Sequence, residues 1–162
     1  MARACKWEVT QHLITMYRDT ESAETRRVLR CLAGNTDTEV AARVLDWMMG
    51  DDVKLQDKTF ILAGVKSAGR AGRELAWSFF RDNSRHFLSI FTSGRLLINL
   101  VTAAMGQGTA NTTEEADMFE NWFMENKVEG VDRTVQQVIE EIRQVAALRE
   151  TLFLTKTNKI PK

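Results

Sequence analysis

The stretch DRTVQQVIEEIRQVAA, residues 132–147, decides the fold class of this chain. Its apolar side chains recur three and four residues apart, which places them on one stripe of an α-helix and leaves the charged side chains in solvent. The stripe consists of Val135, Val138, Ile139, Ile142 and Ala146, and the charged set includes Glu140, Glu141 and Arg143. A half-buried strand would alternate strictly instead, so these residues predict the longest helix of the chain.

The same spacing returns along the rest of the chain, whose only proline is Pro161. Because proline is the strongest helix breaker, its absence elsewhere favours helix throughout. The apolar residues of the other expected helices are Val9, Leu13, Met16 and Tyr17; Val28, Leu29 and Leu32; Val40, Val44, Leu45 and Met48; the run from Val53 to Val65; Leu75, Ala76, Phe79 and Phe80; Phe87, Leu88 and Phe91; Leu96, Leu97, Leu100 and Val101; and Phe119, Trp122 and Phe123.

Capping residues suggest where some of these helices begin and end. Thr36 and Glu39 have the spacing of a capping box, and Thr113 precedes acidic residues that suit a helix N-terminus. A break is expected near Asn83. The apolar run 60–62 is compatible with a strand, but its helical neighbours favour helix.

The expected helices are joined by short loops, which predicts that consecutive helices run antiparallel and stack side by side. We therefore expect an all-α fold, a HEAT/armadillo-like α-solenoid of about eight to nine antiparallel helices. No fixed-period repeat is visible, so periodicity alone does not separate a solenoid from an irregular helical bundle.

Composition limits the classes of partner. Lys plus Arg and Asp plus Glu number 22 each, so no global field favours nucleic acid or a membrane surface, and neither is an expected partner. No apolar run reaches the length of a membrane-spanning helix. Cys5 and Cys31 fit neither a disulfide framework nor a ligand cluster, which favours a reducing, cytoplasmic location.

Residues for catalysis or metal binding are sparse. The only histidines, His12 and His86, lie on different expected helices without a His-Glu-x-x-His pattern, so we predict no metal site and no catalytic residue. The glycine-rich stretch 64–72 lacks the lysine and hydroxyl residue that follow the last glycine of a phosphate-binding loop. We interpret it as a connection between helices.

Basic residues exceed acidic ones between Lys66 and Arg95. Arg70, Arg73 and Arg95 are our candidates for contacts with a substrate. A solvated helix surface, balanced by the acidic stretch 114–129, is the favoured explanation of the same residues.

Three segments carry a resemblance to a known family: VKLQD at 53–57, GRELAWSFFRDN at 72–83 and DRTVQQVIEEIR at 132–143. In this order and at these separations they resemble the C-terminal domain of M1-family zinc aminopeptidases, most closely the puromycin-sensitive group. The resemblance covers nearly the whole chain, from about Ala23 to Leu148. Asn99, Val145 and Leu148 depart from the residues usual in that domain.

The resemblance implies a partial HEAT-like C-terminal domain over residues 1–155. The residues after it, 156–162, are expected from their own sequence to form a flexible basic tail. In the parent enzyme this domain helps to enclose peptide substrate and closes over the active site, so the implied partners are a peptide and the parent's catalytic domain. The zinc motif belongs to an upstream domain of the parent. No cofactor and no catalytic residue is therefore expected in these 162 residues.

An alternative function is that of a free-standing helical-repeat module that binds a peptide or protein on its concave face. In either case we expect an exposed apolar face near Val9 and Leu13 that needs to be covered. A homodimer through this N-terminal helix would cover it.

Overall fold

The computed structural model describes residues 2–19, 28–29, 31–32, 34, 36–92, 94–106 and 112–157. These ranges contain eight α-helices and no strand, which confirms the predicted all-α class. The chain divides into two compact units, Met1–Ala104 and Met105–Lys162. The closer likeness to HEAT or armadillo repeats stays a prediction.

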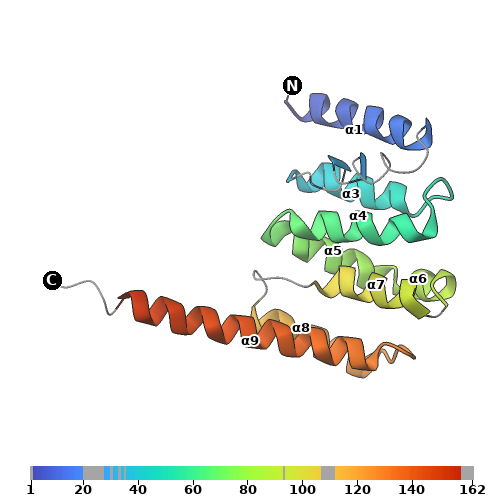
Figure 1. Ribbon diagram of the computed structural model, residues 1–162. Coiled ribbons are helices and arrows are strands. Elements are labelled where there is room, and N and C mark those ends of the chain that lie inside the picture. Colours follow the sequence, from blue (N-terminus) through green and yellow to red (C-terminus); the bar gives the residue numbers. More distant parts are fainter. Residues whose placement is uncertain are drawn as a thin grey trace. The chain divides into compact units, whose positions relative to one another are not determined.

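The first unit contains α1 (Ala2–Asp19), α3 (Thr38–Met48), α4 (Leu55–Ser67), α5 (Arg70–Asp82), α6 (Ser84–Ile90) and nearly all of α7 (Gly94–Met105). Figure 1 shows α1, α3, α4 and α5 stacked in chain order with α6 and α7 next to each other beyond α5, and the chain reverses direction from α3 to α4 and again from α4 to α5. The second reversal takes only Ala68 and Gly69, and Gly69 has a positive φ of 97° that suits glycine. The expected break between α5 and α6 occurs at Asn83.

Aliphatic and aromatic side chains form the core of the first unit. Fully buried residues include Val44, Leu45, Met48, Ile61, Leu62, Val65, Ala76, Phe80, Phe87, Leu100 and Val101. A row of rings links α5 to α6, with centroids 5.7 Å apart for Trp77 and Phe80 and 6.0 Å apart for Phe80 and Phe87. Within the run 60–62, Phe60 is 52% exposed while Ile61 and Leu62 are both buried. Consecutive residues of a strand point to opposite faces, so two consecutive buried residues beside an exposed one fit the helix observed here.

The second unit contains α8 (Thr113–Glu125) and α9 (Asp132–Thr157), which pack against each other. The predicted stripe of α9 from Val135 to Ala146 is buried. Arg143 joins the two helices, because its Nη2 lies 2.6 Å from Asp117 Oδ1 and 2.6 Å from Glu120 Oε2. These carboxylates raise the pKa of the guanidinium, Glu120 more than Asp117. The backbone of α9 continues to Thr157, and residues 158–162 of the expected tail lie outside the described residues.

Both predicted helix caps are wrong by one residue. The N-cap of α3 is Asp37 instead of Thr36, because its carboxylate accepts hydrogen bonds from the N–H groups of Glu39 and Val40. The N-cap of α8 is Thr112, whose hydroxyl accepts from the N–H of Glu115 while the Glu115 carboxylate accepts from Thr112 N–H. This is a complete capping box.

Candidate functional site

Two of the three candidate arginines lie in the first turn of α5. Arg70 is the first residue of the helix, and its side chain is 84% exposed with Nε 2.8 Å from Glu74 Oε1. Arg73 is half-buried, and its N–H donates to Gly69 O over 3.0 Å. The first turn contains no acidic residue, and its cap, Gly69, has no side chain that could accept a hydrogen bond from the N–H groups of this turn. Positive side chains therefore coincide with the positive end of the helix dipole.

The third candidate, Arg95, lies on a different helix. It is exposed and follows Gly94, the first residue of α7. Figure 1 shows α5 beginning where α4 ends and α7 beginning at the opposite side of the stack, beside α6. The structure thus brings Arg70 and Arg73 together but leaves Arg95 elsewhere. A contact of all three with one small ligand is not supported by this arrangement, and their binding role stays a prediction.

Gly72 explains how the start of α5 is held. A Cβ at this position would lie 2.2 Å from Val65 O and 3.1 Å from Ala68 Cβ. The absence of a side chain therefore allows α5 to approach the end of α4 closely. The first residue of the GRELAW segment positions the two arginines through backbone packing and contributes no chemistry.

A buried polar network, which the sequence did not reveal, fastens α1 to α4. The hydroxyl of Tyr17 donates to Asp57 Oδ2 over 3.0 Å and accepts from Lys54 N–H over 3.1 Å. Burial raises the pKa of Tyr17, with further raising by the Asp57 carboxylate. Beside it, the ammonium of Lys58 donates to Met48 O and Gly50 O, and burial lowers the pKa of Lys58. The VKLQD segment therefore supplies a structural anchor.

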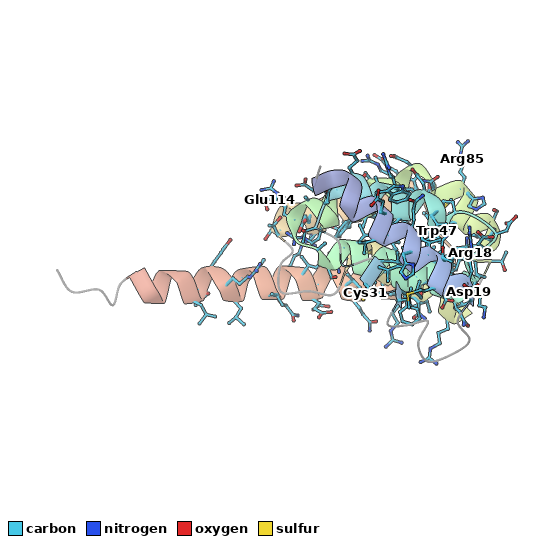
Figure 2. All side chains as sticks on the ribbon, turned by 90° about the horizontal axis from the view of Figure 1, so that it is seen from above. Arg18, Asp19, Cys31, Trp47, Arg85 and Glu114 are labelled. Atoms are coloured by element: carbon cyan, nitrogen blue, oxygen red, sulfur yellow. The ribbon has the colours of Figure 1, made fainter. Side chains whose placement is uncertain are left out.

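Two residues at the end of α1 complete this anchor. Arg18 Nη2 lies 2.5 Å from Asp52 Oδ2, and the ring of Tyr17 packs edge-on against Trp47 with centroids 5.3 Å apart. Figure 2 shows Arg18 at the end of α1 and Trp47 beneath the same helix. The contacts fix α1 against α3 and the loop that precedes α4.

A groove of about 390 Å³ lies between α1 and α3, and sequence analysis did not predict it. The described residues that line it are Trp7, Glu8, Gln11, Asp37, Glu39, Val40 and Arg43. The guanidinium carbon of Arg43 lies 5.0 Å from the centroid of the Trp7 ring. On each helix the lining residues lie one and four positions apart, which places them on one face of that helix. This spacing in the sequence does not indicate which two helices face each other.

Metal-binding chemistry has no support in the described part of the chain. No group of three His, Cys, Asp or Glu side chains there is arranged to hold a metal ion, and both His12 and His86 are exposed, on α1 and α6. The described side chains therefore offer no set of ligands suited to zinc. None of the helices in the described ranges has the length and apolar character that crossing a bilayer requires.

Comparison with known proteins gives a consistent result. A family model described as the ERAP1-like C-terminal domain matches residues 3–144. Aminopeptidase M1-A of Oryza sativa subsp. japonica is 34% identical over 134 residues, which cover 82% of this chain and 15% of the relative. Aminopeptidase M1-B of the same plant is 28% identical over 141 residues, covering 86% of this chain and 16% of the relative. Aminopeptidase M1 of Arabidopsis thaliana is 29% identical over 133 residues, covering 82% and 15%. The chain therefore spans about one sixth of the length of these relatives.

Proposed function

The chain belongs to the ERAP1-like C-terminal domain family, and on this premise we propose that it acts as the non-catalytic C-terminal domain of an M1 zinc aminopeptidase. In that role it helps to enclose a peptide substrate and closes over an active site that another domain supplies. Zinc would belong to that other domain. The observation that carries the proposal is the match over residues 3–144 to a family whose name denotes a C-terminal domain.

The first turn of α5 suits the negatively charged groups of a peptide. Arg70 and Arg73 add their charges to the dipole of an N-terminus that has no acidic residue in its first turn. A peptide carboxylate, acidic side chain or C-terminus, would be attracted to this end of the helix. The pairing of Arg70 with Glu74 moderates that attraction and keeps it at the scale of a surface ion pair.

A chimera tests the proposed role in enclosing substrate. Residues 3–144 would replace the matching segment of the rice aminopeptidase M1-A, with the rest of that enzyme unchanged. Turnover would be measured with a short aminoacyl fluorogenic substrate and with a longer acidic peptide. Charge removal in R70A/R73A should raise KM for the longer peptide by about two- to fivefold and leave the short substrate unaffected.

The matched control is Arg133→Ala, which removes an exposed arginine of α9. Normal turnover of the short substrate reports that each chimera is folded. An equal effect of R70A/R73A on both substrates, or no effect on either, would contradict the role of this helix end in holding peptide.

The alternative, a free-standing peptide-binding module, is favoured by the core and the surface groove that the first unit has of its own. It requires saturable peptide binding by the purified chain alone, weakened by charge reversal at Arg70 or Arg73. Binding only in the chimera would support the aminopeptidase role. Two predictions about the chain remain untested. They are its membership of the puromycin-sensitive group of aminopeptidases and its cytoplasmic location.

A homodimer through α1 is part of the same proposal. Val9 is 56% exposed and Met16 38%, and Leu13 between them is half-buried. Light scattering at increasing concentration should show a dimer in the wild type and a monomer in V9K. A wild-type chain that stays monomeric at high concentration would rule this interface out.

A further inference from the structure

In the part of its lining that the structure describes, the groove between α1 and α3 combines an aromatic ring with more acidic than basic side chains. Trp7 and Glu8 lie on α1, and Glu39 and Arg43 lie on α3. Asp37 is the N-cap of α3. Among the described residues that line it, three are acidic and one is basic, around a volume of about 390 Å³ that lies within the range of small-ligand sites. The lining favours a cationic occupant over an anionic one.

The carboxylates of the groove are not equivalent. Asp37 accepts hydrogen bonds from the N–H groups of Glu39 and Val40, so its charge is partly used to cap the helix. Glu8 and Glu39 are exposed side chains on facing helices. Glu39 already contacts Arg43, so Glu39 and Glu8 would approach from either side a cation that takes the place of Arg43.

Arg43 indicates which cation the groove accepts. Its guanidinium lies 5.0 Å from the centroid of the Trp7 ring, within the range of a cation–π interaction. Its Nη2 lies 3.4 Å from Glu39 Oε1, a long contact between side chains that are 48% and 54% exposed. A residue of the chain itself thus occupies an aromatic and acidic site, and the contacts that hold it there are weak enough to be exchanged.

We propose that this groove binds the arginine or lysine side chain of an extended peptide, and that Arg43 is an internal occupant which the peptide displaces. The incoming cation packs on the indole of Trp7 and pairs with Glu8 and Glu39, while Arg43 turns into solvent. The proposal holds for an aminopeptidase domain and for an independent module alike, because it involves none of the candidate arginines. A site this open predicts a Kd on the order of 1 mM.

Nuclear magnetic resonance of the full chain provides the test. The chain has four tryptophans, so the indole N–H of Trp7 is one of four signals, identified by its loss in W7F. The probes are the peptides Ala-Arg-Ala-Arg-Ala, Ala-Gln-Ala-Gln-Ala and Ala-Glu-Ala-Glu-Ala, with both ends blocked. Only the arginine peptide should shift the Trp7 signal in a saturable manner.

Two variants distinguish displacement of Arg43 from simple surface attraction. R43Q removes the competing cation and should tighten binding of the arginine peptide by about two- to fivefold, whereas E8Q should weaken it by a similar factor. The matched control E125Q removes an exposed carboxylate from α8 and should change nothing.

Three results would overturn the proposal. They are the absence of a Trp7 shift at about ten times the expected Kd, equal shifts with the arginine and glutamine peptides, and unchanged or weaker binding in R43Q. A helical circular dichroism spectrum like that of the wild type is required of each variant, so that loss of binding is not loss of fold.

Discussion

Replacing Gly72 by alanine should loosen the α4–α5 pair, although alanine is the better helix former. The new Cβ would lie 2.2 Å from Val65 O, about 1 Å closer than ordinary contact. The neighbour is a backbone carbonyl of another helix, which cannot rotate away as a side chain would. Overpacking of this kind costs about 1–3 kcal/mol, with the upper end expected here, and the gain in helix propensity offsets about 1 kcal/mol of it. The net loss of stability is about 1–2 kcal/mol.

Thermal and urea unfolding, followed by circular dichroism, measure this effect. For a chain of this size the loss corresponds to a fall in Tm of about 2–8 °C. The matched control is Ala71→Gly, at the exposed neighbouring position of the same helix, which should lose only the propensity difference of about 1 kcal/mol. A Gly72→Ala variant as stable as the wild type, or more stable, would show that the helices do not approach as closely as described.

The remaining predictions concern contacts that join elements. Tyr17→Phe should cost about 1–2 kcal/mol, because it leaves the buried carboxylate of Asp57 without this donor. Tyr17 is the only tyrosine, so the absorbance of its phenolate should titrate above the usual pKa of 10.0. Because folding raises the pKa of Tyr17, its hydroxyl stabilises the folded chain below pH 10.0, and this stabilisation is lost as the pH rises through the folded-state pKa. The phenylalanine variant should not show this loss of stability. Arg143→Met should lower the stability of the second unit modestly, and added salt should narrow its difference from the wild type, because the lost ion pairs are screened. Thr112→Ala should cost about 1 kcal/mol by removing the cap of α8, whereas Thr113→Ala, one residue later, should have little effect on unfolding.

Periodicity was sufficient to predict most of the helices. The buried stripe of α9 and the break at Asn83 follow from the spacing of apolar residues and from a local turn. The caps of α3 and α8 were each predicted one residue away from their positions. Candidate capping residues stand side by side there, at Thr36 and Asp37 and at Thr112 and Thr113, and backbone geometry selects between them.

The sequence alone determined that the described part of the chain is helical, because helix formation depends on residues three and four apart. It also carried the family resemblance, because that resides in contiguous segments such as DRTVQQVIEEIR at 132–143. Only the tertiary structure decided which helices meet. The hydrogen bond between Tyr17 and Asp57 spans 40 residues, and the groove joins Trp7 to Arg43. The tertiary structure also showed that Arg95 lies apart from the first turn of α5. Such contacts depend on the order and direction in which helices stack, which is fixed by the packing of whole faces and leaves no local pattern in the sequence.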